Sequence, residues 1–579
     1  MPEPAVVMPV FDDVEMFRTC EQCGLCASAC PITGKDGFNV RHIIRHIELE
    51  LTEEIAGTPI PWRCTTCGRC ESVCPNGIAV LDIIRPLRAL SPEEYVPEGP
   101  PPCRQACPAG VDVPGYLRLI AQGRPQEAYE LILEKVPFPG ILGRVCTHPC
   151  ETQCRRAEVN QPISICALKR YAADAAPEAP ASALQPGPDT GRKAAVIGSG
   201  PAGLTAAYHL RRKGHQVTIF EAKPKAGGMM RYGIPAYRLP EAVLDKEIDL
   251  VLSLGMELKT GQQMGSDFDL PQLEAQGYEA IFLALGLPQS RKIDLEGADL
   301  EGVSWGVDFL SQVRQDEPVE VKERVLVIGG GNVAVDVGLT ARRLGAKQVT
   351  LACLESREEM PANPWEVEMA LEEGVGLLPS WGPRRILGDN GKVKAIELIE
   401  CTSVFDDEGR FAPRFGEASQ SLEVDQVILA IGQSVDLACL GEPAGCHCHN
   451  GLIQVDPQTQ ETDVKGLFAG GDVAAGPGTI IEAIAAGKRA AAAMDKYLGG
   501  DGRMEPESNP PAGDQHYEGK REKGFADLGR VQTPHLPLEE RLNGFAEVEL
   551  CFDKEQAQAE AQRCLQCDLE RELALKLKT

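Results

Sequence analysis

The chain contains two stretches in which a short apolar run, a glycine-rich turn and a segment with helical period follow one another. The first opens at Lys193 with KAAVIGSGPAGLTAAYHL, and the second opens near Glu323 with RVLVIGGGNVAVDVGL. A continuous apolar run followed by a helix is typical of a strand buried on both faces of a parallel sheet. The pattern therefore predicts two doubly wound α/β units from about residue 191 onward.

Outside these units the apolar spacing is helical, and two proline-rich segments interrupt it. Helical period marks residues 40–52, 115–134 and 554–576, whereas residues 91–102 and 176–190 have the composition of linkers. We expect a multidomain α/β protein in which two helical domains precede two Rossmann-like dinucleotide-binding domains. The first of these dinucleotide-binding domains is expected in two parts, separated by the second. The expected divisions are 1–90, 103–175, 191–290, 291–425, 426–500 and 501–579.

Charge and composition narrow the classes of partner. The 58 Lys and Arg residues stand against 85 Asp and Glu residues, which gives a net charge of −27 at pH 7. This balance argues against nucleic acid or anionic lipid as the main partner. No stretch approaches the ~18 uninterrupted apolar residues that indicate a membrane span. The first residues carry an acidic lead and no basic segment before an apolar run, so we expect no export signal and a cytoplasmic protein.

Cysteine is the unusual residue in this composition. There are 22 cysteines, and most lie in tight Cys-x2-Cys or Cys-x3-Cys sets, which without an export signal indicate metal sites before disulfides. The first two sets, CEQCGLCASACP and CTTCGRCESVCP, follow the run of a bacterial two-cluster ferredoxin, in which the fourth cysteine ligates the other cluster. We expect two [4Fe–4S] clusters here, held by Cys20, Cys23, Cys26 and Cys74 and by Cys64, Cys67, Cys70 and Cys30.

Structural zinc is the alternative for these cysteines. Zinc sites usually combine two Cys-x2-Cys pairs, whereas each set here has three close cysteines and a remote Cys-Pro, so the cluster interpretation is favoured. The separation between the two sets is longer than in a compact ferredoxin. It resembles the helical ferredoxin modules of heterodisulfide-reductase-type and succinate-dehydrogenase-type iron–sulfur subunits.

A second group of six cysteines follows, in the strings CRQACP, VCTHPCETQC and ISICAL. The strings FPGILGRVCTHPCETQCRR and PISI resemble the small subunit of NAD(P)H-dependent glutamate synthase and its relatives, including the N-terminal part of dihydropyrimidine dehydrogenase. The resemblance covers roughly residues 100–500 and implies two [4Fe–4S] clusters in a helical domain that touches a flavin domain. The family's first motif begins with an additional Cys-x2-Cys pair, which this chain lacks at that point.

Six cysteines are too few for two clusters, which need about eight ligands. The C-terminal string RCLQC looks like the family's opening pair moved to the other end of the chain. By analogy we expect one cluster on Cys103, Cys154, Cys564 and Cys567 and another on Cys107, Cys146, Cys150 and Cys166. Relatives use a Gln or Glu slightly beyond the position of Cys166, and the alternative for the C-terminal pair is two surface thiols.

The cysteines outside these sets are expected to be buried or incidental. They are Cys353, Cys401, Cys439, Cys446, Cys448 and Cys551. Two of them belong to the string Cys-His-Cys-His at 446–449, for which a metal site is the alternative.

The first α/β unit carries a dinucleotide-binding motif in its full context. Gly198, Gly200 and Gly203 lie between a strand and a helix, and Glu221 ends the next strand, where it would hold a ribose hydroxyl. Two downstream strings bear on the flavin. One, GLFAGGDVAAGPGTIIEAIAAGKRAA, resembles the second FAD signature of flavoproteins with two dinucleotide domains. The other, GGMMRYGIPAYRLP, is similar to a hallmark of the glutamate synthase small-subunit family. Together they imply that the flavin is lined by Gly228, Met229, Tyr232, Gly471, Asp472 and Thr479.

The second α/β unit has the corresponding turn, and we expect it to bind a nicotinamide nucleotide. Its phosphate turn contains Gly329, Gly331, Asn332 and Ala334, and Glu355 ends the next strand, where an acidic residue favours the free 2′-hydroxyl of NADH. NADPH-using glutamate synthase relatives carry arginines here, whereas this chain has only Arg357 nearby. Alanine at the third turn position is common in NADP-binding units, so NADH is favoured and NADPH stays open.

Together these motifs predict an iron–sulfur flavoprotein. Disulfide reductases of this architecture carry a reactive cysteine pair where this chain has Met229, Met230 and Arg231, so the clusters are the expected outlet for electrons. We expect an NAD(P)H:acceptor oxidoreductase subunit with one FAD and about four [4Fe–4S] clusters, and no catalytic side chain, because the cofactors carry the chemistry. A ferredoxin or another redox subunit would dock at the N-terminal domain, in a hetero-oligomeric complex. A glutamate synthase small subunit proper and a subunit of a flavin-based electron-bifurcating complex are the alternatives.

Overall fold

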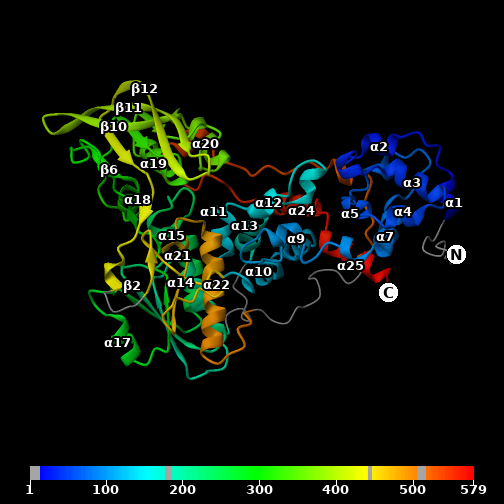
Figure 1. Cartoon of the computed structure of the whole chain (residues 1–579), viewed down its shortest axis with the longest axis horizontal. Coiled ribbons are helices and arrows are strands. Elements are labelled where there is room, and N and C mark those ends of the chain that lie inside the picture. Colours follow the sequence, from blue (N-terminus) through cyan, green and yellow to red (C-terminus); the bar gives the residue numbers. More distant parts are fainter. Residues whose placement is uncertain (1–13, 177–184, 441–445, 505–516, 579) are drawn as a thin grey trace.

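The computed structural model describes residues 14–176, 185–440, 446–504 and 517–578. Part of the expected linker at 176–190 and the first residues of the expected N-terminal domain lie outside this range. The described chain forms an elongated molecule with an N-terminal helical domain at one end, two nucleotide-binding domains at the other and a second helical domain between them (Figure 1). Among the described residues, no helix combines the length and apolar composition needed to cross a membrane.

The N-terminal domain is a set of short helices around its own core. Phe38, Ile43, Ile83, Ile84 and Leu87 are almost completely buried in it. Cys64 and Cys70 belong to this core, and Cys20, Cys26, Cys30 and Cys74 pack at its edge. Its helices are α1 (Val14–Arg18), α2 (Leu25–Ala29), α3 (Val40–Glu48), α4 (Thr52–Ala56), α5 (Ile60–Arg63), α6 (Arg69–Ser72) and α7 (Leu81–Leu90).

The second helical domain shares one hydrophobic core with the first nucleotide unit, which begins at β1 (Lys193–Ile197). Glu247 of that unit reaches across the interface, where its carboxylate accepts hydrogen bonds from the N–H groups of Gly140 (2.6 Å) and Ile141 (2.9 Å) at the start of a helix. The domain's helices are α8 (Pro102–Gln105), α9 (Val113–Ala121), α10 (Pro125–Leu133), α11 (Pro139–Val145), α12 (Pro149–Thr152) and α13 (Ile165–Ala175). The shared core fixes this domain against the first nucleotide unit.

The first nucleotide unit is a five-stranded parallel sheet in the order β17-β4-β1-β2-β3. Helix α22 lies against α14 (Figure 1), and its first residues line the same cavity as the glycine turn. The strands are β1 (Lys193–Ile197), β2 (Gln216–Glu221), β3 (Glu257–Thr260), β4 (Ala280–Leu283) and β17 (Leu467–Ala469). The helices are α14 (Pro201–Arg212), α15 (Met229–Tyr232), α16 (Glu241–Leu252), α17 (Leu270–Ala275), α21 (Asp472–Ala475) and α22 (Ile480–Tyr497).

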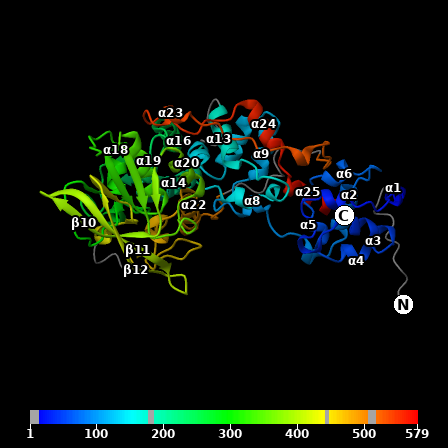
Figure 2. The same ribbon diagram turned by 90° about the horizontal axis from the view of Figure 1, so that it is seen from above.

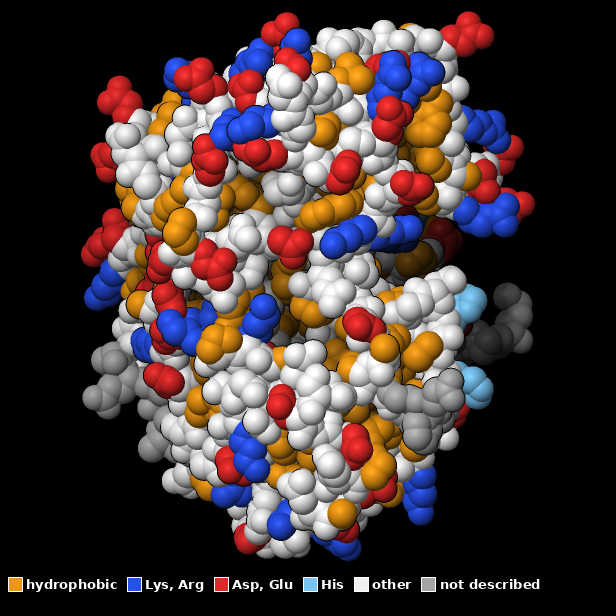
Figure 3. All heavy atoms as spheres, turned by 90° about the vertical axis from the view of Figure 1, so that its left-hand side faces the viewer, with side chains coloured by type: hydrophobic (Ala, Val, Ile, Leu, Met, Phe, Trp, Pro, Cys, Tyr) orange, Lys and Arg blue, Asp and Glu red, His pale blue; other side chains and the backbone are white. Residues whose placement is uncertain are grey.

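The second nucleotide unit repeats this plan, with parallel strands in the order β6-β13-β7-β8-β9 and an antiparallel sheet β10-β11-β12 beside it. The strands are β6 (Val303–Trp305), β7 (Arg324–Ile328), β8 (Gln348–Ala352), β9 (Gly376–Leu378), β10 (Trp381–Asp389), β11 (Lys392–Phe405), β12 (Phe411–Glu423) and β13 (Gln426–Leu429). The helices are α18 (Gly306–Arg314), α19 (Asn332–Arg343) and α20 (Pro364–Glu372). Figure 3 views this end of the molecule, where acidic and basic side chains are interspersed and a recess separates the upper and lower halves.

One expected boundary needs correction. Strand β13 hydrogen-bonds β6 and β7, so the second unit continues to Leu429 and the expected boundary at residue 425 falls one strand too early. The chain then returns to the first unit through β14 (Gln433–Ser434), which pairs with β5 (Gln289–Ser290). The two crossings between the nucleotide units therefore lie side by side.

The C-terminal segment runs along the whole assembly rather than forming a separate domain. Helix α23 (Leu538–Arg541) lies beside the second nucleotide unit, α24 (Lys554–Gln562) packs on α9, and α25 (Cys567–Lys576) packs on α7 (Figure 2). The expected helix over 554–576 is thus two helices. The break falls at Cys564–Cys567, where Gln566 adopts a left-handed conformation with φ of 52°.

Candidate redox centres and nucleotide sites

A cavity of about 550 Å³ opens at the carboxyl end of the first parallel sheet. Gly198, at the end of β1, has φ of 105°, and a Cβ atom there would lie 2.3 Å from the carbonyl oxygen of Ala284. A Cβ atom on Gly203 would lie 2.0 Å from the oxygen of Gly198. Gly200 borders the cavity, and a Cβ atom on it would meet no protein atom closer than 4.0 Å. The first and third glycines therefore serve the turn, and the second leaves room for a ligand.

Glu221 closes the other side of this turn. It is 7% exposed, and its carboxylate accepts hydrogen bonds from the N–H groups of Ser199 (2.9 Å) and Lys223 (2.8 Å). This position at the end of β2 suits a carboxylate that receives a ribose hydroxyl.

The remaining expected flavin residues line the same cavity. Burial raises the pKa of Asp472 to about 7, although the N–H of Gly478 lowers it. Thr479 caps α22 and forms a reciprocal capping box with Glu482, so that the helix N-terminus is directed at the cavity. The cavity's size, its glycine turn and its buried carboxyl groups fit FAD. The lining set from the sequence is Gly228, Met229, Tyr232, Gly471, Asp472 and Thr479.

The second unit has a matching turn. Gly329 has φ of 149°, and a Cβ atom on it would lie 2.3 Å from the oxygen of Ala430. A Cβ atom on Gly330 would lie 2.7 Å from the carboxylate of Glu355, so this acid folds over the turn as Glu221 does in the first unit. A Cβ atom on Gly331 would meet no protein atom within 4 Å. These features fit a nicotinamide nucleotide.

The structure also places two further residues of this turn, and Arg357 beyond the next strand. The side-chain oxygen of Asn332 accepts a hydrogen bond from the N–H of Asn363 (2.8 Å), and Ala334 is fully buried at the start of α19. Arg357 is 2.8 Å from Glu368 in an ion pair. Its guanidinium is therefore already partly neutralised.

Sixteen of the cysteines gather in four places, which we call sites A to D. Site A comprises Cys20, Cys23, Cys26 and Cys74, and site B comprises Cys30, Cys64, Cys67 and Cys70. Site C comprises Cys103, Cys154, Cys564 and Cys567, and site D comprises Cys107, Cys146, Cys150 and Cys166.

Sites A and B interlock as a two-cluster ferredoxin run requires. Burial raises the pKa of Cys26, and the thiols of Cys20, Cys23 and Cys74 raise it further. Burial raises the pKa of Cys30, and the thiol of Cys67, which belongs to the other cysteine set, raises it further. The fourth cysteine of each set has therefore crossed to the other site. Site A is the more open: Cys23 is exposed, whereas Cys64, Cys67 and Cys70 of site B are buried.

Site C joins cysteines that are more than 400 positions apart in the sequence. Burial raises the pKa of Cys103 well above its ordinary value, and the thiols of Cys567, Cys564 and Cys154 raise it further. The C-terminal pair is half-buried rather than a pair of surface thiols. The convergence of these thiols fits the donor set of a cubane cluster.

Site D lies in the same domain. Burial raises the pKa of Cys150 beyond the usual range of a thiol, and Cys146 and Cys107 contribute in the same direction. Cys166 is influenced by Cys146, and its thiol lies 3.3 Å from the carbonyl oxygen of Leu142. Cys166 therefore lies near Cys146 of the same set.

Sites B and C are neighbours across the joint between the two helical domains. Cys67 is buried in one small apolar cluster with Val159, Phe525 and Leu565, and Cys567 packs against that cluster. The four sites thus form a series from the nucleotide units toward the N-terminal end.

The described His, Cys, Asp and Glu residues contain no group of three or more that could hold a single metal ion. Cys448 and His449 of the Cys-His-Cys-His string form the short strand β15, which pairs with β16 (Leu452–Ile453), and both are exposed. Residues 441–445, just before the string, lie outside the described range. Cys439 lines the flavin cavity, which its sequence context did not indicate.

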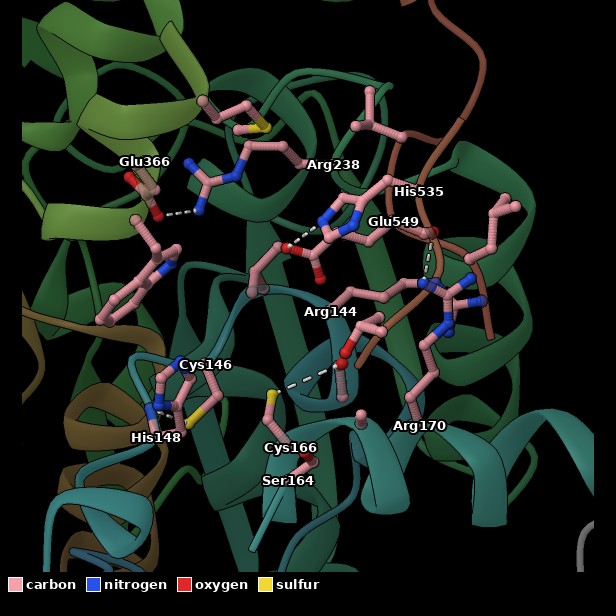
Figure 4. A pocket seen from close by; sticks show the side chains of 18 of the residues that line it. Arg144, Cys146, His148, Ser164, Cys166, Arg170, Arg238, Glu366, His535 and Glu549 are labelled. Atoms are coloured by element: carbon pink, nitrogen blue, oxygen red, sulfur yellow. Dashed lines mark hydrogen bonds and ion pairs between the residues drawn. The ribbon is translucent and has the colours of Figure 1, made fainter. Parts of the chain in front are cut away.

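A second cavity, of about 730 Å³, has no counterpart in the sequence predictions. It lies between the second helical domain, α20 and the C-terminal segment, and Figure 4 shows Cys146 and Cys166 on one side with Arg238 and Glu366 on the other. Arg238 lies 2.6 Å from Glu366 and 2.8 Å from Asp336, which ties the two nucleotide units together. Such long-range pairs leave no local sequence signal.

Comparison with known families assigns the parts of the chain. Residues 192–487 match the pyridine nucleotide-disulphide oxidoreductase family. Residues 99–180 match dihydropyrimidine dehydrogenase domain II, 4Fe-4S cluster, and residues 16–78 match a 4Fe-4S dicluster domain. The chain belongs to the pyridine nucleotide-disulphide oxidoreductase family.

Within this family, similar proteins are named as subunits. The NADP(+)-dependent formate dehydrogenase subunit beta of Moorella thermoacetica is 37% identical over 511 residues, covering 82% of this chain and 71% of its own length. The NADPH-Fe(3+) oxidoreductase subunit beta of Geobacter sulfurreducens is 33% identical over 577 residues, covering 90% and 84%. The NAD-dependent dihydropyrimidine dehydrogenase subunit PreT of Escherichia coli is 34% identical over 403 residues, covering 69% and 91%.

These matches confirm the predicted class. The chain is an NAD(P)H-dependent iron–sulfur flavoprotein oxidoreductase with 4Fe-4S ferredoxin domains, of the kind that serves as a subunit of larger enzymes. The predicted fold, with Rossmann-like parallel sheets preceded by iron–sulfur domains, is also confirmed.

Proposed function

We propose that this subunit carries electrons between NADH, bound at the second nucleotide unit, and a redox partner docked at site A, through FAD and four [4Fe–4S] clusters at sites D, C, B and A. When bound, the nicotinamide and flavin supply hydride transfer and the clusters supply one-electron transfer. The observation that carries the proposal is the position of the C-terminal pair. Cys564 and Cys567 complete a four-thiol set with Cys103 and Cys154, and Cys567 packs against the same apolar cluster as Cys67 of site B.

The flavin end of this series is site D. Lys488 of α22, the helix that starts at the flavin cavity, donates a hydrogen bond of 3.2 Å to the carbonyl oxygen of Ala109, two residues after Cys107. The shared core between the second helical domain and the first nucleotide unit supports a fixed distance between flavin and site D. Contacts between the two domains therefore support a fixed separation between the flavin cavity and site D.

The partner end is site A. Cys23 is exposed there, and the neighbouring Leu25 is 50% exposed. An exposed thiolate ligand beside an apolar side chain suits a transient protein partner, because electron transfer needs close approach and only a small apolar contact. The relatives named as beta subunits or as PreT support a hetero-oligomeric assembly for this chain as well.

NADH is favoured over NADPH by the charges around the second turn. Glu355 folds over the turn, where a carboxylate would repel a 2′-phosphate, and the nearby Arg357 is paired with Glu368. Two of the relatives are named for NADP or NADPH and one for NAD. Neither a glutamate synthase small subunit proper nor an electron-bifurcating subunit gains a specific observation of its own.

The test is the cofactor content of the full chain, purified without oxygen. It should hold one FAD and about 16 iron atoms, since each cubane contains four. Stopped-flow absorbance should show flavin reduction by NADH followed by cluster reduction. About 8 iron atoms per chain, with sites A and B intact by EPR, would overturn the assignment of sites C and D.

A further inference from the structure

Lys169 is a buried cation with an unusual set of neighbours. It lies on α13, one helical turn after Cys166 of site D, and is 4% exposed. Residues three apart on a helix lie on the same side, so the lysine and the cysteine project in the same direction. Among the hydrogen bonds and ion pairs of the described residues, Lys169 forms none with a carboxylate.

The neighbours of the Lys169 ammonium are thiols. Burial alone would lower its pKa, but the thiols of Cys146, Cys166, Cys150 and Cys107 together raise it above its ordinary value. The effect is reciprocal: among the groups that lower the pKa of Cys150 and of Cys166, Lys169 is the largest. All four cysteines of site D therefore face this one positive charge.

The carboxylates near site D are already engaged. Glu151 accepts a hydrogen bond of 2.9 Å from the N–H of Cys166 and lies 2.6 Å from Arg530. Asp174 and Glu547 pair with Arg144 and Arg170. Glu549, which also acts on Cys166, lies 3.9 Å from His535. The ammonium of Lys169 is thus left to balance the charge of the thiolates.

We propose that Lys169 is the fixed counter-charge of the cluster at site D and raises its reduction potential, so that this cluster receives the electron from the reduced flavin. A reduced cluster carries one more negative charge than an oxidised one, and a nearby buried cation stabilises the more negative state. One electron moves from the flavin to the cluster, and Lys169 keeps its proton throughout. The inference rests on the proposed function, because it requires a cluster at site D.

Ligation of iron by Lys169 is the competing role. A ligating amine must first lose its proton, and a lysine ammonium ordinarily keeps its proton at neutral pH. Cys166 supplies a fourth thiol at site D, so the lysine is not needed to complete the set. Lys169 therefore acts on the potential of the cluster and not as a ligand.

The experiment compares Lys169→Met, which removes the charge and keeps the length, with Lys169→Arg, which keeps the charge. Each protein is titrated electrochemically, and the site D signal is followed by EPR. In Lys169→Met the reduced-to-oxidised ratio at fixed potential should fall at least about tenfold, which is about 59 mV for one electron. Lys169→Arg should stay close to wild type.

Arg170→Met is the matched control. This neighbouring cation is already paired with Asp174 and Glu547, so its removal should shift the site D potential much less. An unchanged potential in Lys169→Met with full iron content would overturn the inference.

Loss of iron from the Lys169 variants would also test the inference. If Lys169→Met loses about four iron atoms per chain and Lys169→Arg keeps them at the wild-type potential, the charge is required and the inference holds. If Lys169→Arg also loses them, the lysine acts through its shape or as a ligand, and the inference fails. Wild-type protein without a site D signal would instead refute the proposed function, so the two failures are distinguishable.

Discussion

At the scale of single residues, substitutions at Gly198 and Gly200 test two properties separately, the stability of the turn and the fit of the cofactor. Gly198→Val puts a side chain 2.3 Å from the oxygen of Ala284 at φ of 105°, a conformation that costs a β-branched residue roughly 1–3 kcal/mol before the clash is counted. We expect this variant to lose most of its FAD and to unfold more readily in the first nucleotide unit. Flavin absorbance per chain and thermal unfolding measure both effects.

Gly200→Ala is the matched variant. Its Cβ would meet no protein atom closer than 4.0 Å and its φ of −72° suits any residue, so the fold should survive while the approach of the pyrophosphate is hindered. Iron at sites A and B should be unchanged in both variants. Normal flavin occupancy in Gly198→Val would show that FAD binds elsewhere.

Glu355 controls the choice of nicotinamide nucleotide in our proposal. Glu355→Arg replaces a carboxylate that lies over the phosphate turn with a guanidinium that can bind a 2′-phosphate in bidentate fashion. A charge-assisted hydrogen bond contributes about 1.5–3 kcal/mol, so the ratio of kcat/KM for NADPH to that for NADH should rise roughly tenfold to hundredfold. Steady-state rates with an artificial electron acceptor measure it.

The wild-type ratio decides whether this reading of the pocket is right. A strong preference of the unmodified protein for NADPH would mean that Arg357 leaves Glu368 and receives the phosphate. Arg357→Gln would then lower the NADPH rate and leave the NADH rate unchanged.

At the scale of elements, the C-terminal pair tests how site C is built. Cys564→Ser and Cys567→Ser should each lower the iron content by up to about four atoms per chain, since one cubane holds four. The EPR signal lost should be that of the cluster shared with Cys103. Cys551→Ser is the control, because Cys551 lies on the same segment, is partly buried and belongs to none of the four sites. Unchanged iron and unchanged flavin-to-cluster rates in both pair variants would leave the pair as ordinary thiols.

How far such elements could be predicted depends on whether their signal is local. The cysteine spacings and the glycine turns are local, and they predicted the thiols of sites A and B, whereas the sets of sites C and D came from the family resemblance and stay predictions. Strand β13 was assigned to the wrong part because an apolar strand does not reveal which sheet it joins. Lys169 had no signal at all: a lysine in a helical pattern reads as a solvated residue, and only the fold reveals the four thiols around it.

At the scale of the whole molecule, the C-terminal segment explains how a chain of separate domains can hold redox centres in series. Residues 517–528 lie on the N-terminal domain, and Arg541 of α23 forms an ion pair with Glu372 of the second nucleotide unit. Helices α24 and α25 return to the two helical domains (Figure 2). The linker at 91–102 alone would leave the N-terminal domain free to move. The C-terminal segment holds the N-terminal domain against the second helical domain and places Cys567 against the apolar cluster that contains Cys67.

Glu570 on α25 is the centre of this closure. It is 2% exposed and lies 3.0 Å from Arg85 of α7, with Arg521 at 3.3 Å and the hydroxyl of Tyr517 also donating to it. Burial opposes ionisation, but these partners prevail and hold the pKa of Glu570 below its ordinary value. Its contribution is therefore complete above about pH 4.5, and it is lost as the pH falls through the depressed pKa.

Glu570→Ala should therefore detach the N-terminal domain without touching any cysteine. Removing one partner of a buried ion pair costs about 3–5 kcal/mol, because the remaining charges are left buried and unpaired. We expect a more extended molecule by small-angle scattering and faster proteolysis in 91–102. Reduction of sites A and B by NADH should slow at least tenfold while flavin reduction keeps its rate. Lys578→Ala, an exposed change on the same segment, should alter none of these. Wild-type transfer rates in Glu570→Ala would mean that the clusters are held in register by other contacts, and that the C-terminal segment contributes ligands alone.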